Sequence, residues 1–141
     1  MISLKFKKMT ETASTPFRVY DTDSGFDIAS DENTIIHARS VRKVATGNAF
    51  DIPHGYEIQI RPRSGLSADG VFAILGTIDQ GYRDQVYVTL FNAMMRGYPI
   101  RRGDRIAQIV LKRIDHDVEL EEVEELSETP RGKRGHGSSG R

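Results

Sequence analysis

Residues 56–60 read Tyr-Glu-Ile-Gln-Ile and alternate apolar with polar side chains at every step. Successive side chains of a β-strand point to opposite faces, so this pattern predicts a strand with one face in a core. The same period of two recurs in residues 2–6, 86–90 and 106–111, and turn-forming residues separate these stretches. Many short strands with frequent turns predict an all-β fold, either a sandwich or a barrel, with the jelly roll as one form.

Two segments depart from this pattern. A short helix is expected after Gly65, over residues 66–68. In the segment 118–126, Val118-Glu119-Leu120-Glu121 alternates as a strand does, whereas Leu120, Val123 and Leu126 are spaced three apart, as on a helix. We favour a strand at the start of this segment and keep a helix as the alternative.

Composition excludes several classes of protein. The 141 residues predict one domain, and 38% hydrophobic with 28% charged residues is typical of a globular chain. The sequence has no cysteine, which rules out disulfides, zinc–thiolate sites and cysteine nucleophiles within it. The longest apolar run, residues 71–75, is far shorter than the ~20 residues of a membrane span. Since the first ten residues also lack the apolar core of a signal peptide, we expect a cytoplasmic protein with no membrane partner.

The net charge is zero, but the charges are unevenly distributed. Residues 1–114 hold 16 basic and 12 acidic residues, residues 115–128 hold eight acidic and no Lys or Arg, and residues 129–141 hold four basic and no acidic residues. No sustained basic excess indicates a nucleic-acid partner, so a small anionic ligand is favoured. Residues 129–141 also contain four glycines and no hydrophobic side chain, so burial cannot order them. We therefore predict a β domain over residues 1–128 and a mobile arm over 129–141; an ordinary disordered terminus is the alternative.

Two loop segments offer groups that suit a phosphate or a cation. Residues 23–28 place Asp27 just after a tight turn, and residues 61–67 combine a guanidinium, a hydroxyl and a glycine that exposes backbone N–H groups. Such groups can cradle a phosphate, with added partial positive charge if a helix begins there. The alternative for residues 61–67 is a proline-led turn with a surface arginine.

Two further segments carry candidate catalytic or binding side chains. Residues 76–85 lie between two expected strands, which predicts a β-hairpin. In it, Asp79 is either a general base or a turn-capping aspartate, and Tyr82 is either a stacking platform or a surface aromatic. Residues 103–108 form a turn that leads into an expected strand, and Gln108 at its end either binds a ligand oxygen or is a solvated strand residue.

Taken together and in order, these segments resemble the five motifs of the homotrimeric deoxyuridine triphosphatase (dUTPase) family. The resemblance covers about residues 24–140, and five motifs in family order are far more specific than any one of them. The matching stretches are residues 24–28, residues 62–66, residues 76–79 with Tyr82 and 90–92, residues 103–108, and residues 131–132 with 135–140.

The resemblance implies a dUTPase-like jelly roll, or distorted β-barrel, with a flexible glycine-rich C-terminal arm that closes over an active site of a homotrimer. The implied reaction is dUTP + water → dUMP + pyrophosphate, assisted by Mg²⁺ through water attack on the α-phosphate. Such an enzyme keeps uracil out of DNA and supplies dUMP for thymidylate synthesis.

The resemblance also implies a role for individual residues. Asp79 would deprotonate the attacking water, Tyr82 would pack on the deoxyribose, and Asp27 would reach Mg²⁺ through water. The other residues that the resemblance places around the substrate are Gly76, Ile78 and Tyr87 at the uracil; Arg63, Ser64, Gly65 and Gln108 at the phosphates; and Arg131, His136, Gly137, Ser138 and Ser139 in the arm. Of these, Arg131 would pair with the γ-phosphate, and His136 would stack on uracil.

Two positions depart from the family pattern. His136 stands where the family usually has phenylalanine, and Asp84 stands where it often has glycine, at the bend of the expected hairpin. Two relatives with other functions remain as alternatives. A dCTP deaminase of the same fold needs a glutamate near the hairpin, but none lies between Glu57 and Glu119. A non-catalytic binding or signalling relative is expected to lose Asp79 or the arm, and both are present. A generic β-sandwich binding module is the third alternative.

Overall fold

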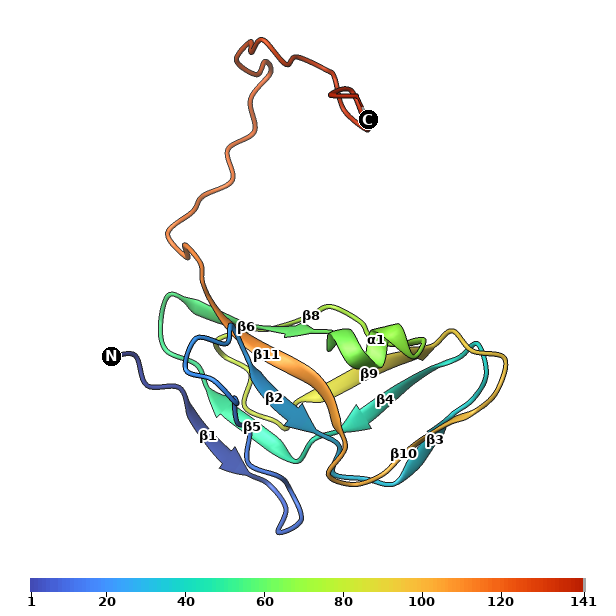
Figure 1. Ribbon diagram of the computed structural model, residues 1–141. Helices are drawn as coiled ribbons and strands as arrows, with labels where there is room; N and C mark the ends of the chain where they lie inside the picture. The colour runs from blue at the N-terminus through green and yellow to red at the C-terminus, as the bar shows by residue number, and fades with distance from the viewer. Residues whose placement is uncertain (141) are drawn as a thin grey trace.

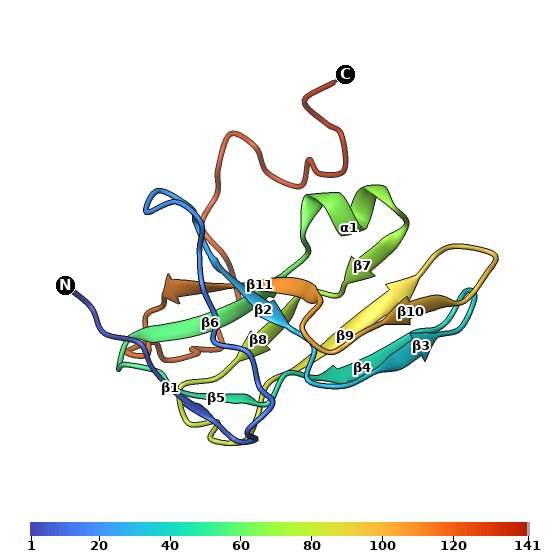
Figure 2. The same cartoon turned by 60° about the horizontal axis from the view of Figure 1, so that its bottom comes forward.

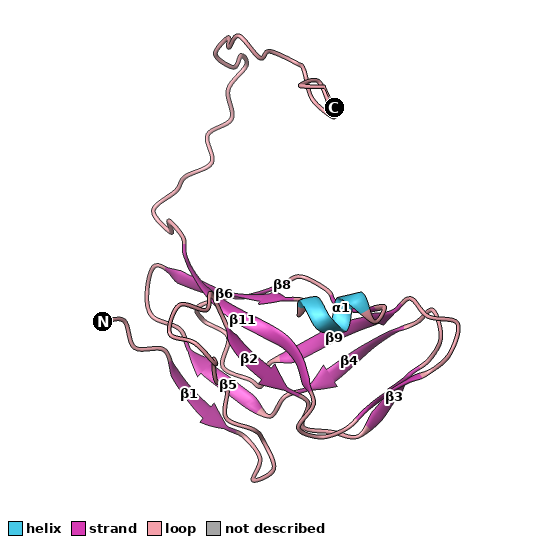
Figure 3. Ribbon diagram, viewed as in Figure 1, coloured by secondary structure: helices cyan, strands magenta, loops and turns pink. Residues whose placement is uncertain are grey.

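A computed structural model describes residues 1–140 and confirms the all-β prediction, with one short helix among many strands (Figures 1 and 3). The elements of the described chain are β1 Lys5–Lys8, β2 Phe26–Ala29, β3 Thr34–Ile36, β4 Val41–Ala45, β5 Asn48–Asp51, β6 Tyr56–Arg61, α1 Ser64–Ala68, β7 Val71–Ala73, β8 Gly76–Ile78, β9 Tyr87–Asn92, β10 Tyr98–Ile100 and β11 Arg105–Arg113.

The largest sheet has the strand order β2-β11-β6-β8, and all of its neighbours are antiparallel. A second sheet has the order β4-β9-β7, and the pairs β10-β3 and β1-β5 form two-stranded sheets. Figure 2 shows these pieces arranged around a common interior. Within residues 1–140 the strands remain in four separate sheets and do not close into one hydrogen-bonded barrel.

The period-two stretches at residues 56–60, 86–90 and 106–111 supply much of the core, as the sequence predicts, whereas residues 2–6 do not, since Ile2 and Phe6 are 51% and 44% exposed. Ile58 and Ile60 of β6 are fully or almost fully buried, and so are Val88 and Leu90 of β9. Their polar neighbours Glu57 and Gln59 lie on the other face of β6 and are only half-buried. One cluster of buried side chains draws on both larger sheets, so burial of apolar surface joins them into a single domain.

The prediction of a two-stranded hairpin over residues 76–85 is wrong. β8 pairs with β6, with Ile78 opposite Ile58, whereas β9 pairs with β4 and β7. The segment between β8 and β9, called here the 79–86 loop, therefore connects two different sheets. Local alternation predicts that both flanks are strands, but it does not determine which strands they pair with.

The short helix is confirmed as α1, which begins two residues earlier than expected, at Ser64. No helix within residues 1–140 is long and apolar enough to cross a membrane. The favoured strand at Val118 is wrong: residues 114–120 form neither strand nor helix, and Val118 and Leu120 are 67% and 97% exposed. Figure 1 shows this segment rising away from the body, where no strand edge among residues 1–140 lies beside it to pair with it.

Candidate functional site

Three polar side chains share one face of the largest sheet because of its register. Gln108 of β11 is the cross-strand partner of Asp27 on β2 and of Arg61 on β6. Directly opposite residues in a sheet project from the same face. All three line a hollow of about 310 Å³, together with Ser24 and Gly25 of the turn before β2. The sequence therefore brings the first, second and fourth motif segments to one place.

Asp27 lies between two arginines. Its Oδ1 accepts from Arg63 Nε and its Oδ2 accepts from an Arg105 terminal nitrogen, both at 3.1 Å. The Asp27 side chain is only 18% exposed, so both pairs are partly shielded from water. Sequence reasoning missed Arg105. The one feature of the sequence that pointed to this residue was its position in the 103–108 segment. Its ion pair with Asp27 joins residues 78 apart, so the pair depends on the fold.

Gly25 is required by close packing against β11. A Cβ at this position would lie 2.8 Å from the Ile109 carbonyl oxygen and 3.0 Å from Gln108 Oε1. Any side chain at Gly25 would push β2 and β11 apart beside the hollow. The side-chain amide of Gln108 is held through its nitrogen, because Nε2 donates to the Pro62 carbonyl at 3.1 Å. The amide thus links β11 to the loop that leads into α1.

The start of α1 presents free backbone donors. Arg63 occupies the N-cap position with extended backbone and makes no side-chain capping bond, so the first amides of the helix are left for water or a ligand. Both Ser64 and Gly65 are exposed. A Cβ added at Gly65 would meet nothing within 4 Å, so packing within the described chain does not require a glycine there. A second hollow of about 440 Å³ lies beside Gly65, Arg63 and Arg105.

The 79–86 loop holds Asp79 and Tyr82 on the surface. The Asp79 carbonyl accepts from the Tyr82 amide at 3.0 Å, which closes a turn, and the Asp79 side chain is free of hydrogen bonds to the rest of residues 1–140. The Tyr82 hydroxyl donates to the Gln85 carbonyl at 2.9 Å. Partial burial raises the pKa of Tyr82, and the Asp84 carboxylate and Tyr87 phenol raise it further. The ring is therefore anchored by a neutral hydroxyl.

Asp84 fits its place in the loop without glycine's conformational freedom. Its φ is not positive; among residues 1–140 only Arg39 and His136 are non-glycine residues with positive φ. The Asp84 Oδ1 accepts from the Gln85 amide at 2.7 Å, which stabilises the bend. The departure from the family's glycine is thus accommodated locally.

The fold does not bring Asp79 to the start of α1 within one chain. Asp79 follows the Ile78–Ile58 pair and therefore lies near Glu57, at one end of β6. Ser64 lies beyond Arg61, at the other end of the same strand. The four residue-to-residue steps from 57 to 61 alone span about 13 Å. Two halves of the candidate site are thus built at opposite ends of the sheet.

The arm residues also lie apart from the body. Residues 118–140 are exposed throughout, and no hydrogen bond joins them to the rest of the described chain. Within the arm, Arg131 Nε donates to the Arg134 carbonyl at 2.9 Å. His136 and Gly137 follow one another with φ of 45° and 86°, so the backbone is left-handed at both. Arg131, His136, Gly137, Ser138 and Ser139 are therefore not brought to the other candidate residues.

The described chain offers little for a directly coordinated metal. Residues 1–140 contain no group of three or more His, Asp or Glu side chains arranged to hold an ion. Asp23 and Asp27 both line the first hollow, and of these two Asp27 is the one that pairs with arginine side chains. Each of its oxygens accepts one arginine bond and keeps acceptor capacity for a water molecule. This donor set fits a magnesium ion that takes its other ligands from phosphates and water.

Comparison with known proteins gives a consistent result over the whole length. The dUTPase family model matches residues 11–140. The deoxyuridine 5'-triphosphate nucleotidohydrolase of Helicobacter hepaticus is 42% identical over 140 residues, covering 97% of this chain and 88% of the relative. The protein of that name from Paramecium bursaria Chlorella virus 1 is 41% identical over 142 residues, covering 99% of both.

Solved structures give the same result. The dUTPase of Staphylococcus bacteriophage 80alpha with dUpNHpp superposes with a TM-score of 0.94 at 29% identity, covering all of both chains. A mutant of the dUTPase from Staphylococcus aureus phage phi11, described as coordinating a structural Mg(II) ion, gives a TM-score of 0.82 at 27% identity and covers 88% of this chain and 98% of that one.

Proposed function

This chain belongs to the dUTPase family and hydrolyses dUTP to dUMP and pyrophosphate, and we propose here how its residues divide that work. The observation that carries the proposal is the cross-strand row of Asp27, Gln108 and Arg61, which opens beside the uncapped start of α1. A triphosphate needs donors and positive charge over several oxygens, and this end of the sheet concentrates both.

The phosphates bind at the start of α1. Ser64 contributes its hydroxyl and amide, Gly65 contributes an amide that no side chain shields, and Arg63 and Gln108 add donors. Gln108 then gives up its bond to the Pro62 carbonyl or shares it with a phosphate oxygen. Arg105 balances the Asp27 charge, so the carboxylate does not repel the triphosphate.

Asp79 deprotonates the water that attacks the α-phosphorus. Its carboxylate is exposed and free of hydrogen bonds to the rest of residues 1–140, so both oxygens are available to orient a water molecule. A positioned carboxylate within hydrogen-bond reach of the proton suits this task. Proton removal and phosphate binding are thus assigned to different elements.

The nucleoside binds between β8 and β9. Tyr82 packs on the deoxyribose and leaves no room for a 2′-hydroxyl, and its ring is fixed by the bond from its hydroxyl to Gln85. Backbone groups at Gly76, Ile78 and Tyr87 read the uracil edge. Base selection by backbone N–H and C=O groups requires groups that strand pairing leaves free. Among the described strands, β8 is the last of its sheet, and β9 pairs with β7 only from Leu90 to Asn92, so each strand keeps an open edge.

The cofactor is Mg²⁺, which Asp27 holds through water. The ion, when bound, neutralises charge on the phosphate oxygens and so makes the α-phosphorus easier to attack. Asp27 is suited to an indirect role because both of its oxygens already accept arginine bonds. The arginines fix the carboxylate's orientation, and the remaining acceptor capacity holds water.

The active unit is a homotrimer in which neighbouring subunits complete each site. The separation of Asp79 from Ser64 along β6 supports this arrangement, because one chain cannot apply both to one substrate. Closed symmetric oligomers are the common solution for shared sites.

We expect light scattering of the full chain to give a mass near three times 15.8 kDa at micromolar concentration. A mass of one subunit, measured in a preparation that turns over dUTP, would contradict the shared site.

Substrate selection tests the function directly. With Mg²⁺, the protein should release pyrophosphate from dUTP quickly and from UTP and dTTP slowly, and it should release no ammonia from dCTP. Ammonia from dCTP would instead assign it to the deaminases of the same fold. Substituting Tyr82→Ala should raise the ratio of UTP to dUTP turnover by about 10-fold or more, since a deleted steric block is worth 1–3 kcal/mol.

An unchanged ratio in Tyr82→Ala would remove the tyrosine from sugar selection. Val41→Ala is a matched control on an exposed strand position outside the site, and its ratio should equal that of the wild type.

A further inference from the structure

The 79–86 loop is held unevenly along its length. Its second half is well anchored: the Val86 amide donates to the Asn48 carbonyl at 2.7 Å, and the Gly47 amide donates to Gln85 Oε1 at 3.0 Å. The Val86 carbonyl also accepts from the Thr46 hydroxyl at 2.6 Å. Its first half, which contains Asp79, has no backbone bond to any strand among the described residues.

One side chain bridges this first half to the body. A terminal nitrogen of Arg83 donates to the carbonyls of Gln80 and Tyr82, which lie on the turn that Asp79 begins. The other terminal nitrogen pairs with Asp51 Oδ1 at 2.9 Å. A planar guanidinium can hold carbonyls and a carboxylate at the same time in a fixed relation, which an ammonium cannot.

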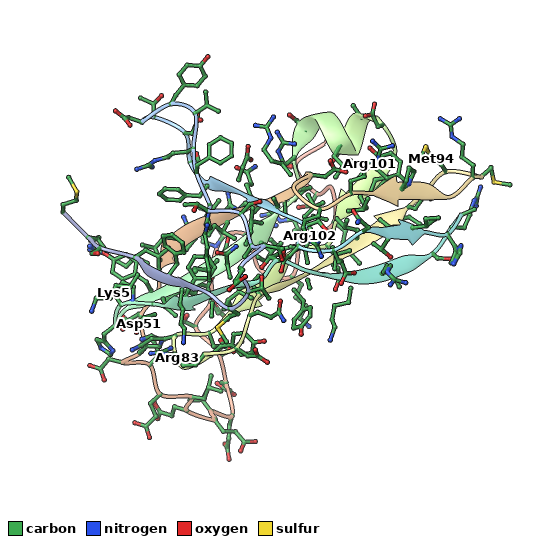
Figure 4. All side chains as sticks on the ribbon, turned by 90° about the horizontal axis from the view of Figure 1, so that it is seen from below. Lys5, Asp51, Arg83, Met94, Arg101 and Arg102 are labelled. Carbon is green, nitrogen blue, oxygen red and sulfur yellow. The ribbon has the colours of Figure 1, made fainter. Side chains whose placement is uncertain are left out.

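The anchor of this bridge is a sheet position. Asp51 is the last residue of β5, and its cross-strand partner is Lys5 at the start of β1. Figure 4 shows Lys5, Asp51 and Arg83 at the same end of the molecule. The β1-β5 sheet therefore provides a fixed point for the Arg83 guanidinium.

The bridge contributes little to global stability. The side chains of Arg83 and Asp51 are 54% and 55% exposed, and exposed ion pairs are weak because water and salt screen them. Its effect is local: it fixes the backbone of a turn that no other hydrogen bond among residues 1–140 ties to a strand. Removing it should therefore loosen residues 79–82 without unfolding the protein.

We propose that Arg83, anchored on Asp51, is a positioning residue that sets the place of Asp79 for water attack. This inference rests on the proposed role of Asp79 as the general base. Misplacing a reacting group by about 1 Å can slow a reaction by ~10²-fold. The bridge from Arg83 to Asp51 therefore affects the rate constant for the chemical step more than substrate affinity.

The test compares Arg83→Ala with Arg42→Ala in the full chain. Arg42 makes a similarly exposed contact with Glu32, at 4.0 Å, away from the 79–86 loop, so it controls for losing a surface arginine. Arg83→Ala should lower kcat by about 10- to 100-fold with KM changed less than about threefold, and Arg42→Ala should change neither. Both variants should unfold within about 2 °C of the wild type.

Amide hydrogen exchange gives a second measurement that is independent of activity. In Arg83→Ala, exchange over residues 79–82 should become faster, whereas exchange in β6 and β11 stays unchanged. Arg83→Lys should recover only part of the lost rate, since an ammonium keeps the positive charge but cannot hold the turn carbonyls and the Asp51 carboxylate at once in a fixed geometry.

Three results would each overturn the proposal: a kcat of Arg83→Ala within twofold of the wild type, unchanged exchange over residues 79–82, or full recovery with lysine. Failure of the proposed base is distinguishable, because it would appear as retained activity in Asp79→Asn while the exchange result for Arg83→Ala is unaffected.

Discussion

Replacing Asp79 with asparagine should lower kcat by about 10²–10⁴-fold, the range typical for the loss of a general base. The amide keeps the size and most of the hydrogen-bonding capacity of the side chain but cannot accept the proton from water. Binding of dUTP should be largely preserved, because the phosphate donors lie at the other end of β6. The measurement is steady-state pyrophosphate release at saturating dUTP with Mg²⁺, together with a separate titration of a non-hydrolysable dUTP analogue.

The same substitution should leave the fold intact. The Asp79 carboxylate is exposed and makes no hydrogen bond within residues 1–140, so no buried group loses a partner. Asp117→Asn, on the exposed segment after β11, is a matched isosteric control and should retain wild-type kcat. If Asp79→Asn keeps more than about half of the wild-type rate, another group removes the proton.

Deleting residues 130–141 should lower turnover by about 10²-fold or more while the fold survives. The deletion removes Arg131 and the glycine-flanked amides, and loss of a single preorganised donor to developing charge costs about 10²–10³-fold in kcat. No core residue is lost, since residues 118–140 are exposed throughout. Thirteen extended residues reach about 43 Å, whereas a compact body of this size has a radius of gyration of about 14 Å, so the arm can cover a neighbour's site.

Closure of the arm should depend on the ligand's charge. Ordering thirteen residues costs about 1–2 kcal/mol each if they are fully fixed, and the arm has no apolar side chain to offset that cost. Amide exchange over residues 129–140 should therefore slow with a non-hydrolysable dUTP analogue plus Mg²⁺, and slow less with dUMP. Equal exchange with and without the analogue, together with full activity after the deletion, would show that the arm takes no part in catalysis.

The residues of the candidate site could be named from the sequence because five short motifs stand in the order of the dUTPase family, whereas each segment alone also allowed a turn-capping or surface role. Asp27 after a turn, Ser64 and Gly65 at a helix start, and Asp79 after a strand all occupy the positions that local patterns predict. The strands around Ile58 and Val88 were predictable from a local pattern alone, since burial of alternate side chains requires a period of two.

What the sequence could not supply was which segments meet. The Asp27–Arg105 pair joins residues 78 apart, and the Arg83–Asp51 pair joins residues 32 apart; neither has a local pattern. Alternation at Val118-Glu119-Leu120-Glu121 predicted a strand, but a strand also needs a free edge beside it, and no edge among residues 1–140 lies there. Alternation on both sides of the 79–86 loop likewise predicted a hairpin, whereas β8 and β9 pair in different sheets.

The sequence by itself thus determined the strands around residues 56–60, 86–90 and 106–111, the short helix and the positions of the motif segments, because side-chain periodicity and turn residues act over a few neighbouring positions. Only the tertiary structure decided the pairing of β8 with β6, the charge balance around Asp27, and the separation of Asp79 from Ser64. These depend on how buried faces from distant segments fit together in one core, and that fit is a property of the whole chain rather than of any stretch of it.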